Sequence, residues 1–154
     1  MVVVSSLVAL TAVATAAWAP AGVANSPRGT VALRGGVEAT VRLSPANCTT
    51  GPGLTFLLDG VKGGSWDLLF LHASKPVGKR AAARIDLAGQ GFRDNQAAVA
   101  TWSGHERGGV SFGPGARSGA IRTTLRLVSS ENGPAPTSVR VAATWSRGAC
   151  KEAE

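Results

Sequence analysis

Apolar and polar residues alternate along much of the chain from Thr30 onward. In the stretch 121–127, for example, Arg122, Thr124 and Arg126 alternate with the residues of a more apolar face. A period of two places successive side chains on opposite faces of a strand, so each such stretch predicts a half-buried antiparallel strand. The pattern is clearest in the stretches 38–43, 121–127 and 139–145.

Further stretches have the length of strands but a less regular pattern, and turn-forming residues separate them. Gly51-Pro52-Gly53 and Gly113-Pro114-Gly115 are two of these separators. Glycine and proline supply the backbone angles that tight turns require, so the separators predict short connections between strands. The less regular stretches are 31–34, 54–58, 66–72, 81–87, 97–103 and 110–112.

Together these patterns predict an all-β fold: a single antiparallel β-sandwich, Ig-like or jelly-roll-like, with about eight or nine short strands. The 20 glycines and 8 prolines of the chain also suit such a fold better than a helical bundle. No linker divides the chain between residues 30 and 150, so we expect one domain over residues 25–154.

The first residues form an apolar segment that predicts export from the cell. Residues 1–19 contain no charged side chain, and the small residues Gly22 and Ala24 follow Pro20. This arrangement is typical of a secretory signal peptide, here residues 1–24, with cleavage after Ala24. The alternative is a membrane anchor through residues 1–19, because about 19 apolar residues are just enough to span a bilayer.

The chain has two cysteines, Cys48 and Cys150. Such a pair in an exported chain predicts a structural disulfide, formed in an oxidising compartment, and therefore a secreted location. Closing a loop of about 100 residues contributes on the order of 4 to 5 kcal/mol in the chain-entropy model. Two cysteines alone cannot form a tetrahedral zinc site, and we expect neither a metal nor a cofactor.

The chain is strongly basic, with 16 basic and 9 acidic residues and a formal net charge of +7 at pH 7. Such a charge can attract nucleic acid, anionic lipid or acidic polysaccharide, so cell-wall polysaccharide or another anionic surface is a candidate partner. No run of basic residues or interleaved aromatics indicates a nucleic-acid site. Because the cations are spread singly, the sequence favours a solvated surface over a dedicated polyanion site. The arginines include Arg80, Arg84, Arg93, Arg107, Arg117, Arg122, Arg126, Arg140 and Arg147.

The C-terminal part of the chain carries a short motif. It consists of the run Gly119 to Leu125, a turn at Asn132 to Pro136, the run Val139-Arg140-Val141, and Thr144-Trp145-Ser146 before Cys150. This motif resembles the C-terminal strands of small exported proteins of actinobacteria, and the composition rich in alanine, glycine, arginine and valine is similar too. The resemblance implies an exported all-β protein and no particular activity.

Neither histidine has a recognisable catalytic partner in the sequence. His72 lies in an apolar stretch, where a hydrogen-bonded histidine at the rim of the core is the expected role. His105 lies beside Ser103 and Glu106 in a polar turn, but the members of a hydrolase triad normally come from separate elements. We therefore expect no catalytic residue, and the scattered carboxylates select no pair, namely Asp59, Asp67, Asp86 and Asp94.

Three tryptophans of the domain, Trp66, Trp102 and Trp145, have two alternative roles. A buried set would fill a core that is short of other aromatic residues, whereas an exposed row would stack on sugar rings. Trp145 lies on the apolar face of the stretch 139–145, which favours the core. Trp66 and Trp102 are the candidates for stacking on a ligand.

These observations predict an exported protein with a structural, surface or binding role and without enzyme activity. One alternative is a carbohydrate- or polyanion-binding module, which a row of tryptophans or arginines on one face would favour. The other is a secreted hydrolase, which requires His72 or His105 within hydrogen-bond reach of a nucleophile or a carboxylate.

Overall fold

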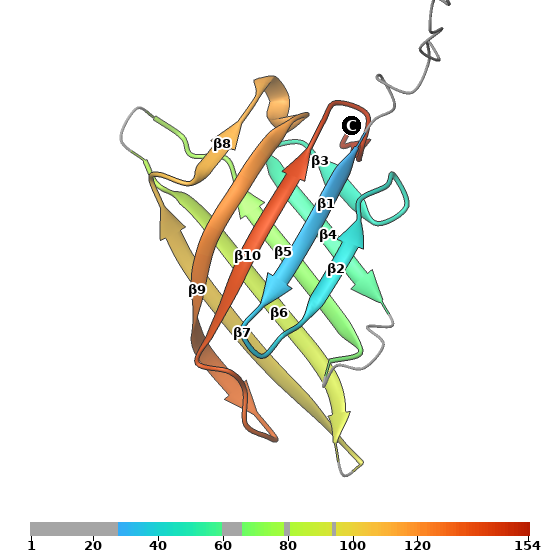
Figure 1. Cartoon of the computed structure of the whole chain (residues 1–154), viewed down its shortest axis with the longest axis vertical. Helices are drawn as coiled ribbons and strands as arrows, with labels where there is room; N and C mark the ends of the chain where they lie inside the picture. Colours follow the sequence, from blue (N-terminus) through green and yellow to red (C-terminus); the bar gives the residue numbers. More distant parts are fainter. Residues whose placement is uncertain (1–27, 60–65, 79–80, 94) are drawn as a thin grey trace, which may run out of the picture.

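The computed structural model describes residues 28–59, 66–78, 81–93 and 95–154 (Figure 1). These residues form an all-β fold, as predicted, with eleven strands and one short 3-10 helix, η1 (Pro114–Ala116). Within these ranges, no helix is long and apolar enough to cross a membrane. The predicted signal peptide, its cleavage site after Ala24 and the alternative anchor lie outside the described residues.

The strands follow the alternating stretches of the sequence, but several of them are longer than the pattern predicts. Strands β6 and β7 have 11 residues each, and β9 has 13. The pattern does not predict the short strands β3 and β11. In chain order the strands are β1 (Gly29–Arg34), β2 (Ala39–Arg42), β3 (Cys48–Thr50), β4 (Gly53–Asp59), β5 (Leu68–Ser74), β6 (Ala83–Arg93), β7 (Gln96–Glu106), β8 (Val110–Phe112), β9 (Gly119–Glu131), β10 (Ser138–Trp145) and β11 (Lys151–Glu152).

The strands that the structure describes belong to one mixed sheet. Its order is β11-β3-β4-β5-β6-β7-β9-β10-β1-β2, and β8 pairs with β9 outside this path. The sheet curls into a half-barrel, so that β9, β10, β1 and β2 lie in front of β4 to β7 in Figure 1. The predicted Ig-like or jelly-roll-like sandwich is not confirmed, because hydrogen bonds between β7 and β9 join the two layers into a single sheet.

The core lies between the two layers and is built mainly from aliphatic side chains, together with Phe56 and three tryptophans. Strand β10 shows how the sequence produces it, because its buried and exposed residues alternate strictly after Ser138. The predicted inward position of Trp145 is confirmed, and its indole Nε1 donates a hydrogen bond of 2.8 Å to the carbonyl oxygen of Ala116. The inward residues of β10 are Val139, Val141, Ala143 and Trp145.

The predicted disulfide between Cys48 and Cys150 is confirmed, with the two Cα atoms 4.9 Å apart. Cys48 is the first residue of β3, and Cys150 directly precedes β11. Strand β11 is parallel to β3, which makes the sheet mixed. The disulfide therefore holds the C-terminal strand on the β3 edge of the sheet.

Candidate functional site

The outer face of strands β2, β1, β10 and β9 gathers five exposed arginines from four strands. Each occupies a polar position of its strand, so its apolar neighbours turn inward and the arginine turns outward. The other residues on this face are mostly alanine and threonine. We call this surface the arginine face and define it by Arg34, Arg42, Arg122, Arg126 and Arg140.

The register of the sheet places these arginines side by side. Arg34 on β1 pairs directly with Arg140 on β10. Two residues further along these strands, Ala32 pairs with Ala142, and Ala142 pairs in turn with Arg122 on β9. Paired residues of antiparallel strands lie on the same face with their Cβ atoms about 5 Å apart. Arginines that are distant in the sequence are therefore neighbours on the surface.

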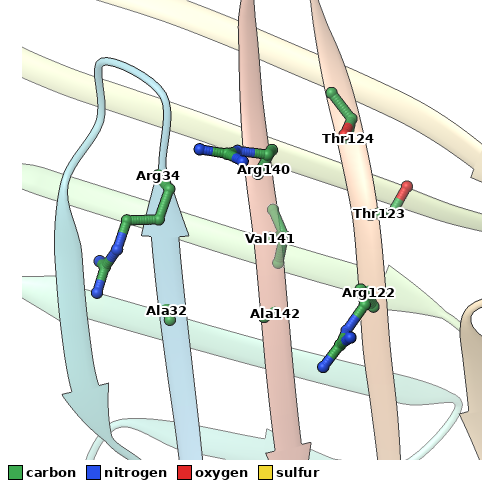
Figure 2. Close-up of a pocket in the computed structure, with 8 residues that line it drawn as sticks. All are labelled: Ala32, Arg34, Arg122, Thr123, Thr124, Arg140, Val141 and Ala142. Atoms are coloured by element: carbon green, nitrogen blue, oxygen red, sulfur yellow. The ribbon is translucent and has the colours of Figure 1, made fainter.

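A shallow groove with a volume of about 470 Å³ runs over the arginine face. The groove forms where the small side chains of Ala32 and Ala142 line the sheet. Figure 2 shows that arginine side chains extend around them from three neighbouring strands. Two further depressions, of about 200 and 450 Å³, extend the groove along the same strands. The groove is lined by Ala32, Arg34, Arg122, Thr123, Thr124, Arg140, Val141 and Ala142.

Arg34 is held in place by the pair of strands on which it lies. Its Nη1 donates hydrogen bonds to the carbonyl oxygens of Leu33 and Ala39, at 2.8 and 3.0 Å. Its Nη2 donates to Oγ1 of Thr40 at 2.9 Å, and its Nε lies 3.5 Å from a carboxylate oxygen of Glu38. Arg34 therefore ties β1 to the edge strand β2 while it adds its charge to the face.

The other four arginines of the face have no hydrogen bond or ion pair with the residues that the structure describes. Their guanidinium groups can therefore bind an anion without breaking an internal contact. Like charges that lie directly opposite each other on a sheet are destabilising, as for Arg34 and Arg140. A bound anion would offset that repulsion.

Glu38 is an acidic residue at the edge of the arginine face, beside Arg34 in the turn between β1 and β2. The backbone N–H of Gly35 donates to its Oε1 at 2.7 Å, and that of Gly36 lies at 3.4 Å. The hydrogen bond from Gly35, with the nearby positive charges of Arg34 and Arg140, lowers the pKa of Glu38 below its ordinary value. Glu38 is therefore ionised at neutral pH and offsets part of the positive charge.

The two tryptophans considered for ligand stacking are buried. Trp66 and Trp102 are 3% and 0% exposed, and their rings meet edge to face with centroids 5.5 Å apart. A buried ring offers no face to a sugar, so both side chains pack the core in this structure. Among the described strands, the exposed aromatic side chains are instead Phe70 and Phe92.

His72 lies on the outer face of β5, between two hydroxyl groups. Its Nδ1 is 3.0 Å from Oγ1 of Thr55, and its Nε2 is 3.0 Å from Oγ of Ser74. These hydroxyl groups are within hydrogen-bond reach of the histidine, as the secreted-hydrolase alternative requires of a nucleophile. Among the described residues no carboxylate orients the ring, however, because the partner of each ring nitrogen is a hydroxyl group and not the carboxylate of the neighbouring Asp86.

Of the other residues considered for chemistry, Ser103 and Asp86 lie together. Ser103 donates its hydroxyl to Asp86 at 2.6 Å, and His105 is exposed near the end of β7. Asp94 and the side chain of Asp59 lie outside what the structure describes. In the described part of the chain, no group of three His, Cys, Asp or Glu side chains is arranged to hold a metal ion.

The arginine face is the feature that the sequence did not reveal. The arginines occur singly in the sequence, and the pairing of β1 with β10, which brings them together, leaves no trace in the local pattern. One signal was available: the three clearest alternating stretches, 38–43, 121–127 and 139–145, all carry arginine at polar positions. Pairing 121–127 with 139–145, as β9 pairs with β10, would have predicted a basic surface.

No protein-family model matches the chain, and comparison with curated proteins and with solved structures finds no similar protein.

Proposed function

We propose that this chain is an exported protein that binds polyanions through the arginine face and catalyses no reaction. The observation that carries the proposal is the gathering of five arginines on one outer face, four of them without a hydrogen bond or ion pair to the described residues. Arginine suits this role because its planar guanidinium group forms paired hydrogen bonds with carboxylate and phosphate groups.

The face suits an extended anion better than a single small one. The groove is open, and neighbouring depressions continue it over the same strands. Arg42 on β2 and Arg126 on β9 are separated by three strand spacings, or about 14 Å, across the sheet, and by six residues, or about 20 Å, along the strands. A small anion reaches one or two of the arginines, whereas a polymer can contact all of them.

The chemistry of the face favours an acidic wall polymer over nucleic acid. The outward residues of β1, β2, β9 and β10 that line the groove include no aromatic side chain. Proteins that bind single-stranded nucleic acid generally combine a basic groove with aromatic rings on which bases stack. Export supports the same partner, because a disulfide fits an extracellular location, where cell-wall polysaccharide or another anionic surface is available.

The central test measures binding to inorganic polyphosphate by isothermal titration calorimetry at low ionic strength, where screening is weak. The double variant R122Q/R140Q removes two unpaired arginines from the groove, and we expect it to weaken binding at least about tenfold. The control variant K75Q/K151Q removes the same charge from exposed lysines outside the face, and we expect a change within about twofold.

Two outcomes would contradict the proposal. An equal loss in both double variants would show that net charge governs binding and that the arrangement of the arginines does not matter. A wild-type protein that fails to bind polyphosphate would exclude the arginine face as a general polyanion site.

Export is tested separately by the intact mass of the protein recovered from its native host, before and after reduction and alkylation. We expect a species that begins at Asn25 and has no free thiol. A species that retains residues 1–24 and carries two alkylated thiols before reduction would contradict export and the disulfide together.

A further inference from the structure

A row of polar side chains crosses the outer face of the sheet and reaches the arginine face. The register pairs Thr55 on β4 with His72 on β5, and His72 with Asp86 on β6. It then pairs Asp86 with Ser103 on β7, and Ser103 with Arg126 on β9. We call these five residues the polar row. Because paired residues share a face, the row is continuous over five strands and ends on a member of the arginine face.

Hydrogen bonds hold four of the five side chains of the polar row, those of Thr55, His72, Asp86 and Ser103, before any ligand binds. A hydroxyl group lies 3.0 Å from each ring nitrogen of His72. Asp86 accepts a hydrogen bond of 2.6 Å from Ser103 through Oδ1 and one of 2.8 Å from Arg84 through Oδ2. Each of these oxygens can take part in a second hydrogen bond. The row can therefore bind hydroxyl groups without the entropic cost of ordering its side chains.

Phe70 lies beside the polar row on the same face of β5, two residues before His72. Its side chain is 41% exposed, and its neighbours across the strands are Leu57, which is 45% exposed, and Ala88. An exposed ring beside oriented polar groups suits a sugar, because the ring packs on the apolar face of the sugar while the polar groups bind its hydroxyls.

We propose that the polyanion of the arginine face is an acidic polysaccharide whose chain continues along the polar row to Phe70. The inference rests on the proposed function and names its ligand class. Strands β9 and β5 are three spacings apart, or about 14 Å, so one polymer chain can cover the row and reach the groove. Its acidic groups lie on the arginines, and its sugar rings lie on Phe70 and the polar row.

The test compares two polyanions, one with sugar rings and one without: polygalacturonate and inorganic polyphosphate. The variant F70L keeps an apolar side chain but removes the ring. We expect F70L to weaken polygalacturonate binding about fivefold and to leave polyphosphate binding within about twofold of wild type. The control is F92L, which removes the ring of Phe92, 72% exposed and six residues beyond Asp86 along β6, and we expect it to leave both affinities unchanged.

A thermal melt checks that F70L is folded, and F70W serves as the second variant, for which tighter binding of polygalacturonate is expected. If F70L and F70W bind polygalacturonate like wild type, or if wild type binds polyphosphate only, the inference is overturned while the proposed function stands. If wild type binds neither polymer, the proposed function itself fails.

Discussion

At the scale of single residues, Glu38 sets the charge balance of the arginine face. Replacing it by glutamine removes the negative charge but keeps an oxygen that can accept the hydrogen bond from the N–H of Gly35. We expect E38Q to bind polyphosphate about twofold more tightly than wild type, because an exposed charge has a modest effect. Calorimetry at pH 7 measures this difference, and weaker binding by E38Q would show that Glu38 helps to bind the anion.

The same residue gives the face a dependence on pH. The folded-state pKa of Glu38 lies below its ordinary value of 4.5. Ionised Glu38 therefore stabilises the fold above pH 4.5, and this stabilisation is lost as the pH falls through the folded-state pKa. Binding changes in the opposite direction, because protonation removes a repelling charge. The difference in polyphosphate affinity between E38Q and wild type should therefore vanish in acid, and a difference that persists there would contradict this account.

Single tryptophans show what the sequence can and cannot predict about burial. The core position of Trp145 follows from its place on the apolar face of a strongly alternating stretch. Trp102 lies between Thr101 and Ser103, so its local pattern permits either face. The structure buries it completely, and its Nε1 donates a hydrogen bond of 2.7 Å to the carbonyl oxygen of Pro136. That partner comes from a distant turn and cannot be found by local reasoning.

At the scale of the elements, Arg34 has a structural role that the other arginines of the face lack. Its hydrogen bonds to Ala39 and Thr40 hold β2, a four-residue edge strand that pairs with β1 on one side. We expect R34A to speed amide hydrogen exchange in β2 about fivefold, because these bonds oppose local opening of the edge. Exchange measured by mass spectrometry on peptides of β2 tests this.

The control for that experiment is R122A, which removes an arginine that has no hydrogen-bond partner among the described residues. It should leave exchange in β2 unchanged. Equal acceleration in both variants would mean that the loss of a charged outer side chain, and not the loss of the hydrogen bonds of Arg34, loosens the edge.

The existence of the strands could be predicted from the sequence, but their neighbours could not. Alternation identifies β2 and β10 almost to their ends and β9 as far as residue 127, because buried or half-buried positions alternate with exposed ones there. It misses the end of β9, where residues 128–131 are all exposed. It misses β3 and β11, since three and two residues are too few to show a period. It also leaves open whether the strands form one sheet or two, because the pairing of β7 with β9, which includes a register shift near Trp102, depends on contacts distant in the sequence.

At the scale of the whole molecule, the candidate site exists only because the two ends of the domain meet. Strand β1 near the beginning pairs with β10 near the end, and this pairing places Arg34 beside Arg140. The net charge predicts an attraction to anions, whereas the strand order concentrates that charge on one face. A basic protein with the same composition but another strand order would present a diffuse surface.

The disulfide holds β11 at the edge of the sheet opposite β2, and its removal should lower the stability of the fold. Strand β11 pairs with β3 through two residues, and its ion pair between Glu152 and Arg117 is exposed and therefore weak. The double variant C48A/C150A frees a loop with a sequence separation of 102, at a cost of up to about 4 to 5 kcal/mol in the chain-entropy model.

We therefore expect its melting temperature to fall by on the order of 15 °C, and reduction of the wild-type protein to have the same effect. Alanine is preferred to serine in this variant because both positions are buried, at 3% and 6% exposure, and an unpaired hydroxyl would add a cost of its own. Polyphosphate binding below the melting transition should be retained, since the arginine face lies on strands that do not contain the cysteines. An unchanged melting temperature would show that packing alone holds β11 on the sheet, and a loss of binding in the folded variant would show that the disulfide also shapes the arginine face.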